Sequence, residues 1–284
     1  MARYKIVLPL LFSFFGCNSA TETSQATSVN ATTKTDSTVQ APVATTDTVK
    51  ALAGEVPFAG KQVPILCYHQ IRDWRATDSK SAQVYIVPVA AFKDQIKTLH
   101  DSGYHTILPD QLVEYLQHGK PLPSKPIMLT FDDATESQIT AALPELDKAG
   151  YKAVFFIMTV VLGRPTYMTK DQVKQLAAKG HVVGCHTWDH HMTTKYKEED
   201  WKIQVEKPKA LLETITGMPV KYFAYPFGLW NKNAVAHIKQ HNFTASFQLA
   251  AKLDADDPLQ TIRRIIPAGQ WSTARLMTAI NRDF

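Results

Sequence analysis

Short apolar runs rich in β-branched residues alternate with amphipathic stretches over the part of the chain that begins near Val63. Such runs favour β-strands, and those at 127–131 and 153–158 are almost wholly apolar, which is typical of strands covered on both faces. The predicted strands are residues 64–68, 105–108, 127–131, 153–158, 182–185, 221–224, 244–247 and 262–266.

The stretches between these runs carry apolar residues at helical spacing. In the first of them Phe92, Ile96 and Leu99 stand at positions i, i+4 and i+7, and Gly103 follows where a left-handed residue commonly ends a helix. The predicted helices are residues 88–102, 110–117, 136–149, 169–178, 198–215, 231–240 and 272–281.

Alternating strands and helices predict an α/β fold with a parallel sheet, and their number favours an irregular (β/α) barrel with about seven strands. An open doubly wound sheet is the alternative, although no GxGxxG motif opens any strand-to-helix turn. In both architectures the functional side chains gather at the C-terminal ends of the strands.

The first residues have the pattern of an export signal. Arg3 and Lys5 precede an apolar stretch at 6–15, which is too short to remain as a membrane-spanning helix. The stretch ends at Cys17 and is similar there to the lipobox of bacterial lipoproteins. We therefore expect a signal peptide at 1–17 and a lipidated Cys17, with ordinary cleavage as the alternative. The protein would be exported and lipid-anchored in the cell envelope, or else periplasmic or extracellular.

Composition separates the remainder into a linker and a folded part. Residues 18–56 are rich in Thr, Ser and Ala with few aromatics, and such a segment buries too little apolar surface to offset the entropy of ordering. We expect a disordered linker at 18–56 and one folded domain at 57–284. The net charge of +5 comes with no basic cluster, so nucleic-acid binding is not expected. Membrane contact is expected only through the lipid anchor.

Cys67 and Cys185 stand in apolar runs without a CxxC partner, so we expect buried free thiols. A disulfide is the alternative in an oxidising compartment.

Two adjacent carboxylates, Asp132 and Asp133, directly follow the strand predicted at 127–131. Like charges side by side raise each other's pKa unless a cation lies near, and a bound divalent metal would supply one. The alternative is a helix start, where Asp is a favoured residue.

Histidines follow the strand predicted at 182–185. His186 and His190 are four residues apart, and a zinc-type catalytic site needs three protein ligands and one open position. One carboxylate and two imidazoles would supply that set, although His191 leaves the choice of ligand ambiguous. A capping or surface role for the histidines is the alternative.

Three further motifs end strands. His69 is a candidate general acid, or else a structural histidine. The Phe-Ala-Tyr-Pro-Phe-Gly stretch at 223–228 predicts a rigid wall with exposed rings for stacking on a sugar, so Tyr225, Pro226 and Phe227 are candidate substrate-binding residues; a hydrophobic turn is the alternative. Arg264 is a further candidate substrate-binding residue; it could instead neutralise a nearby carboxylate or simply be exposed.

These motifs resemble the polysaccharide deacetylases that share the NodB-type domain (carbohydrate esterase family 4). The Thr-Phe-Asp-Asp stretch at 130–133 and the His-Thr-Trp-Asp-His stretch at 186–190 are similar to the family's TFDD and H-[ST]-x-x-H motifs. The resemblance extends from about Val63 to Ile266. The stretches at 64–69 and 223–228 are most similar to the branch acting on poly-β-1,6-N-acetylglucosamine.

The resemblance implies a metal-dependent hydrolase that removes acetyl groups from N-acetylglucosamine-containing polysaccharide. Asp132 would be the general base, His69 the general acid and the backbone N–H of Phe227 an oxyanion donor. The implied metal ligands are Asp133, His186 and His190. For one Asp and two His ligands we expect Zn²⁺ first, with Co²⁺ or Ni²⁺ as alternatives. We also expect a monomer.

The sequence departs from the family pattern at three places. Ala134 stands where many members have Gly, and Ala224 where many carry an Arg that holds the catalytic Asp; Arg264 is a candidate to replace that Arg in space. The family's D-x-x-D-W and late L-x-H motifs are missing, which requires His69 to carry the acid role. The alternatives are O-deacetylation of xylan or another glycan, and a non-catalytic glycan-binding lipoprotein.

Overall fold

The computed structural model describes residues 62–249 and 251–284. The predicted signal peptide with Cys17, and the predicted linker at 18–56, lie outside these residues. None of the described helices is both long and apolar enough to cross a bilayer.

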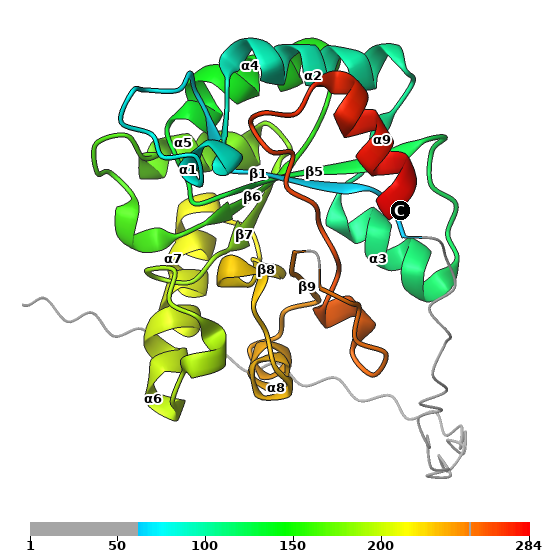
Figure 1. Cartoon of the computed structure of the whole chain (residues 1–284). Helices are drawn as coiled ribbons and strands as arrows, with labels where there is room; N and C mark the ends of the chain where they lie inside the picture. Colours follow the sequence, from blue (N-terminus) through cyan, green and yellow to red (C-terminus); the bar gives the residue numbers. More distant parts are fainter. Residues whose placement is uncertain (1–61, 250) are drawn as a thin grey trace, which may run out of the picture. The chain divides into compact units, whose positions relative to one another are not determined.

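A parallel seven-stranded sheet forms the centre of the described chain, with the order β1-β5-β6-β7-β8-β9 and with β4 beside β5. Helices surround its outer side (Figure 1). The sheet confirms the predicted barrel-like α/β fold with about seven strands. Its strands are β1 (Ile65–Tyr68), β4 (His105–Thr106), β5 (Pro126–Asp132), β6 (Val154–Ile157), β7 (Val182–Cys185), β8 (Tyr222–Ala224) and β9 (Ala245–Phe247).

Apart from α1, which the pattern did not predict, the helices lie where helices were predicted. They are α1 (Ala82–Tyr85), α2 (Val89–Asp101), α3 (Pro109–His118), α4 (Leu143–Ala149), α5 (Lys170–Ala178), α6 (Glu198–Trp201), α7 (Lys207–Thr216), α8 (Lys232–Gln240) and α9 (Thr273–Asp283). Two predicted helices contain a π-helical turn, at Gln138–Ala142 and Lys202–Glu206. Pro144 and Pro208 follow these turns. Proline lacks an N–H and collides with the carbonyl four residues earlier in a regular α-helix, and the wider turn relieves both problems.

The strand predicted at 262–266 is wrong as a regular strand. This segment makes only two isolated bridges, Ile262 with Phe247 of β9 and Ile265 with Leu66 of β1. It changes partner from one strand to the other within three residues, so consecutive pairs do not form on either side. The segment therefore joins the two ends of the strand order. A short pair that the pattern did not predict, β2 (Gln70–Ile71) and β3 (Ile86–Val87), lies after β1.

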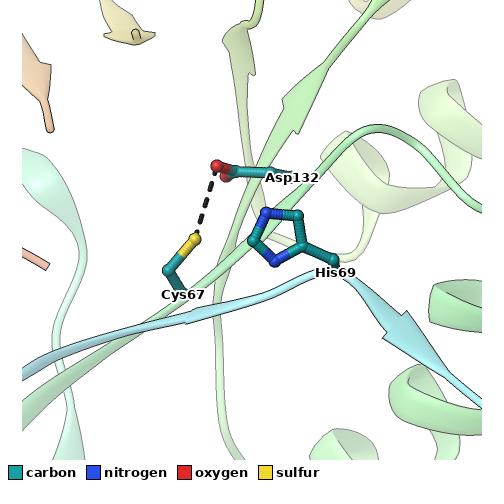
Figure 2. Close-up of side chains that lie close together, drawn as sticks. All are labelled: Cys67, His69 and Asp132. Carbon is teal, nitrogen blue, oxygen red and sulfur yellow. Dashed lines mark hydrogen bonds between the residues drawn. The ribbon is translucent and has the colours of Figure 1, made fainter. Parts of the chain in front are cut away.

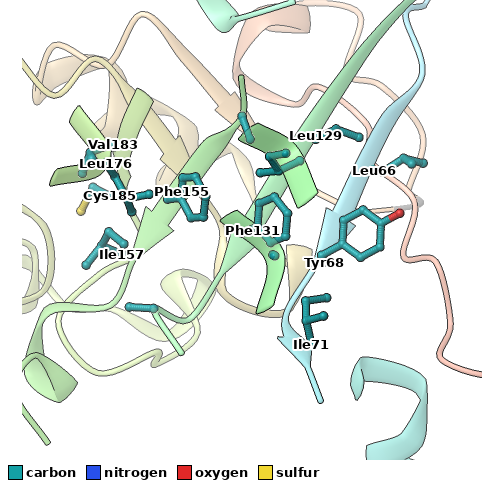
Figure 3. Packing of buried hydrophobic residues seen from close by; sticks show 14 of the residues in the cluster. Leu66, Tyr68, Ile71, Leu129, Phe131, Phe155, Ile157, Leu176, Val183 and Cys185 are labelled. Carbon is teal, nitrogen blue, oxygen red and sulfur yellow. The ribbon is translucent and has the colours of Figure 1, made fainter. Parts of the chain in front are cut away.

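Alternate residues of each strand face opposite sides of the sheet. The outward side chains pack under the helices in one apolar cluster, shown in Figure 3, where Phe131 stacks on Phe155 at a centroid distance of 4.9 Å. The inward side chains, such as Met128 and Phe156, form a second cluster inside the barrel. Fully burying a side chain of this size contributes roughly 1.5–3 kcal/mol. Both faces are thus apolar, and polar side chains on the inner face need a specific partner.

Candidate active site

Asp132 is the last residue of β5 and faces the inside of the barrel, where it is buried. Arg264, which is fully buried, donates two parallel hydrogen bonds of 2.7 Å to it, from Nη1 to Oδ1 and from Nη2 to Oδ2. The same guanidinium donates to Thr130 Oγ1 at 3.0 Å and to the carbonyl oxygen of Gln248 at 3.0 Å. The bonds to Thr130 and Gln248 fix the guanidinium, which in turn holds Asp132 in one orientation.

Burial alone would raise the pKa of Asp132, but the positive charge of Arg264 outweighs it and holds that pKa well below its usual range. Asp132 is therefore ionised at neutral pH. Ala224, at the position where many family members carry an Arg, is a buried residue of the inner face. Arg264 contacts Asp132 instead, from the segment at 262–266 that follows β9. Because it is buried behind Asp132, it positions the carboxylate and does not present a surface to substrate.

Asp133, His186 and His190 come together at the ends of β5 and β7, and one ligand atom of each lies within 4.8 Å of the others. The Nε2 atoms of His186 and His190 are 3.4 Å and 3.6 Å from Asp133 Oδ1. Asp133 Oδ1 and His186 Nε2 are buried and have no hydrogen-bond partner in the described chain. Buried polar atoms that face one another without a hydrogen bond fit a site for a cation.

Hydrogen bonding decides the tautomer of His186. Its Nδ1 lies 2.8 Å from the carbonyl oxygen of Ala224, which can only accept, so Nδ1 carries the proton and Nε2 offers a lone pair. Burial together with the neighbouring His186 lowers the pKa of His190 to about 4, so His190 is neutral near pH 7. Burial would lower the pKa of His186, but the facing carboxylates of Asp132 and Asp133 outweigh it and raise that pKa, so a cation bound at Nε2 would take the place of a proton. One carboxylate and two imidazoles suit a zinc-type divalent ion. His191 is not part of the set, since it is exposed and pairs with Asp189 at 2.6 Å.

Several residues of the site adopt left-handed backbone angles that disfavour side chains. The φ values are 76° at Asp133, 67° at Thr187 and 68° at His190. Ala134 has φ 60°, so the turn after the two acids keeps the conformation that Gly would favour. Backbone strain of this kind persists where the surrounding structure imposes it, and it concentrates at functional sites.

His69 lies beside Asp132 on the rim of the sheet, and Cys67 lies beneath them (Figure 2). The Cys67 thiol donates a hydrogen bond of 3.4 Å to Asp132 Oδ2. The His69 ring meets the ring of Tyr85 edge to face, at a centroid distance of 5.1 Å, and its Nδ1 has no partner in the described chain. The predicted buried, unpaired state of Cys67 and Cys185 is confirmed.

The loop after β8 supplies the opposite wall. Phe227 is 53% exposed, and its ring lies 4.5 Å from that of His190. Phe227 has φ 60°, and its backbone N–H makes no hydrogen bond within the described chain. Tyr225 and Pro226 are buried, so of the three substrate-binding residues predicted in this loop only Phe227 presents a ring to solvent.

Two adjoining cavities open at this edge of the sheet. The first has a volume of about 270 Å³ and is lined by His69, Asp132, Asp133, His186 and His190 among others. The second, of about 570 Å³, shares His190 with it. The predicted metal ligands, base and acid therefore surround one cavity that solvent can enter.

Tyr85 lines the first cavity and was missed by the sequence reasoning, as were Lys195 and Tyr196 of the second. Tyr85 belongs to α1, a four-residue helix that carries too little periodicity to signal a site. The 195–196 segment follows the motif at 186–190, and that closeness in sequence was the available signal.

A family model described as polysaccharide deacetylase matches residues 119–246, a range that contains both the Asp-Asp and the His-x-x-x-His segments. Residues 119–246 match the polysaccharide deacetylase family. Among curated relatives of this deacetylase domain, peptidoglycan-N-acetylglucosamine deacetylase PgdA of Listeria monocytogenes is 33% identical over 65% of this chain and 39% of the relative. Poly-beta-1,6-N-acetyl-D-glucosamine N-deacetylase of Escherichia coli O157:H7 is 24% identical over 78% of this chain and 39% of the relative.

Solved structures show the same fold. The Streptococcus pyogenes deacetylase PplD superimposes with a TM-score of 0.71 at 23% identity, covering 78% of this chain and 98% of that one. IcaB from Ammonifex degensii gives a TM-score of 0.65 at 25% identity, covering 78% and 97%. The chain spans between 39% and 60% of the length of the first curated relatives that this deacetylase domain matches.

Proposed function

We propose that this protein removes acetyl groups from N-acetylglucosamine-containing polysaccharide and releases acetate, using a divalent ion held by Asp133, His186 and His190. The observation that carries the proposal is the cluster itself. Two buried, unpartnered ligand atoms face each other 3.4 Å apart, beside a carboxylate that Arg264 keeps ionised. Zn²⁺ is the first candidate for this donor set, with Co²⁺ and Ni²⁺ as alternatives.

When bound, the ion would act as a Lewis acid on the acetyl carbonyl. Asp132 is fixed in place and ionised, so it can accept a proton from the attacking water. The N–H of Phe227 points to no partner in the described chain, so it can donate to the oxygen that gains negative charge. Water and the amide thus yield acetate and a free amine.

His69 would protonate the departing nitrogen. It lines the same cavity as Asp132, and histidine is the side chain most often used in general acid–base catalysis. An amine is a poor leaving group unless it gains a proton. The assignment of an acid to the end of the first strand agrees with the motif at 64–69, which resembles the poly-β-1,6-N-acetylglucosamine branch.

A polymeric substrate is supported by the second cavity. One acetylated sugar would bind in the first cavity. The second cavity, of about 570 Å³, offers further space beside it, and the two cavities share His190 and Phe227. A neighbouring sugar of the same polysaccharide can therefore lie against Tyr196 while the sugar in the first cavity loses its acetyl group. The half-exposed ring of Phe227 stands between the two positions as a stacking surface.

Acetate release across a panel of acetylated glycans tests this proposal. The panel contains β-1,6-linked and β-1,4-linked N-acetylglucosamine oligomers and acetylated xylan, each with metal-loaded protein. We expect release from the β-1,6-linked oligomers, rising with oligomer length. Release of acetate from xylan alone would indicate O-deacetylation. No release from any of the glycans would support a non-catalytic glycan-binding protein.

We also propose export with lipid attachment at Cys17, and action as a monomer, since one chain supplies every group of the site. The signal-like pattern at 1–17 supports export. Metabolic labelling with a radioactive fatty acid should mark the wild-type protein and not Cys17→Ala.

A further inference from the structure

Cys67, His69 and Asp132 form a second convergent set of ligand atoms, next to the set at Asp133. A sulfur, a ring nitrogen and a carboxylate oxygen lie within 4.8 Å of one another. Figure 2 shows the three side chains turned toward a common point, with the Cys67 sulfur 3.4 Å from Asp132 Oδ2. From this geometry we infer a second, inhibitory metal site that takes a thiolate-binding ion such as Zn²⁺ or Co²⁺.

The donor chemistry suits such an ion. Thiolate and imidazole ligands select Zn²⁺ and similar metals over Mg²⁺ or Ca²⁺, and three protein ligands leave one position for water. Ligand atoms in a tetrahedral zinc site lie roughly 3.5 Å apart, so closing the set requires shifts of about 1 Å. His69 and Asp132 line the 270 Å³ cavity, so an ion would approach the buried Cys67 sulfur from that side. The Cys67 proton leaves to solvent as the ion binds.

The surroundings make this the weaker of the two sites. Arg264 donates to both oxygens of Asp132 and would become a hydrogen-bonding partner behind a metal ligand, as such ligands commonly have. Its positive charge, and an ion already held at Asp133, both oppose a second cation. We therefore expect the second ion to bind at least about tenfold more weakly than the first. The site fills only when metal is in excess.

Filling it would stop catalysis, a consequence that rests on the proposed function. The ion would occupy the carboxylate that accepts the proton of water and the imidazole that protonates the amine. Excess Zn²⁺ should therefore inhibit the enzyme through Cys67, although Cys67 takes no direct part in the reaction.

Titration of the metal-free protein with Co²⁺ tests the site without any substrate. Only the second set contains sulfur, so a near-ultraviolet thiolate-to-cobalt charge-transfer band should develop with the second equivalent and not the first. Cys67→Ala and Cys67→Ser should bind one equivalent with no band. Cys185→Ala, which removes the other described thiol from an apolar cluster, should keep the band.

The inference is overturned if the wild-type protein binds only one equivalent of Co²⁺ and shows no band. It is also overturned if the band persists in Cys67→Ala, because that variant retains Cys17 and Cys185. In a second measurement, each variant is compared with its own activity at one equivalent of Zn²⁺. Excess Zn²⁺ should lower wild-type activity at least tenfold and leave Cys67→Ser unchanged relative to its own reference. Equal inhibition of both proteins would contradict the site. Loss of all acetate release with the cobalt band intact would count against the proposed function alone.

Discussion

Arg264 and Asp132 are 132 positions apart in the sequence, yet the guanidinium of one donates two hydrogen bonds of 2.7 Å to the carboxylate of the other. Both side chains are almost completely inaccessible, at 0% and 3% exposure. A bidentate pair of this kind fixes the direction of the carboxylate as well as its charge. The proposed base, Asp132, is therefore positioned by a residue from the far end of the domain.

Arg264→Ala should leave an uncompensated buried carboxylate. We expect a loss of about 3–5 kcal/mol in the free energy of unfolding. We also expect a large loss of turnover, because Asp132 would lose the two donors that orient it. Arg264→Lys keeps the charge without the two parallel donors, so it should recover part of the stability and little of the activity. Urea unfolding and acetate release measure both quantities. Arg263→Ala is the matched control, and an Arg264→Ala protein as stable as that control would contradict this account.

The two adjacent aspartates should separate in their effects. Asp133→Asn should lose bound metal and turnover, because it removes the only carboxylate of the predicted ligand set. Asp132→Asn should keep the metal and lose roughly 10²–10⁴-fold in turnover, the usual contribution of acid–base catalysis. Metal analysis of the purified variants beside acetate assays distinguishes them. Full activity in either variant would show the roles to be misassigned.

The loss of rate caused by His69→Ala should depend on the leaving group of the substrate. With an N-acetylated sugar the rate should fall roughly 10²–10⁴-fold, because the amine needs a proton. With 4-nitrophenyl acetate, whose phenolate leaves without protonation, the loss should be much smaller. If the rates with both substrates fall equally, His69 has a structural role and not that of an acid.

His181 makes stability depend on pH. It is buried, its Nδ1 accepts a hydrogen bond from the Ala153 N–H, and burial lowers its pKa to about 4. Between the unfolded value near 6.5 and pH 4, the unfolded chain binds a proton that the folded one does not, so stability falls as the pH falls, by up to roughly 3 kcal/mol. His181→Asn keeps the acceptor and should flatten the curve of melting temperature over this range. The exposed His118→Asn should not, and identical slopes in all three proteins would refute the effect.

Much of the fold follows from local pattern. The apolar run at 127–131 and the helical spacing of Phe92, Ile96 and Leu99 predict β5 and α2 because burial repeats with the period of each element. The segment at 262–266 has the composition of a strand but exchanges one partner for another after Ile262. The composition of a segment indicates that it is buried, but it does not indicate with how many strands the segment pairs.

Some parts of the candidate site could likewise be predicted from the sequence, and others could not. Asp133 and His186 could be placed at one rim, because the C-terminal ends of parallel strands lie together. The contact of Arg264 with Asp132, and that of Cys67 with the same carboxylate, depend on side chains crossing the inside of the barrel, which no local spacing encodes. Tyr225 and Phe227 have similar sequence surroundings, yet one ring is buried and the other exposed. The direction of a side chain in a tight turn is decided by the backbone, here by φ 60° at Phe227.

The dependence of acetate release on metal tests the central claim most directly. Protein stripped with a chelator should release no acetate from β-1,6-linked N-acetylglucosamine oligomers, and one equivalent of Zn²⁺, Co²⁺ or Ni²⁺ should restore release. Stripped Asp133→Asn should not recover under the same addition. Acetate released at an undiminished rate by the stripped wild-type protein would contradict a catalytic ion at Asp133, His186 and His190.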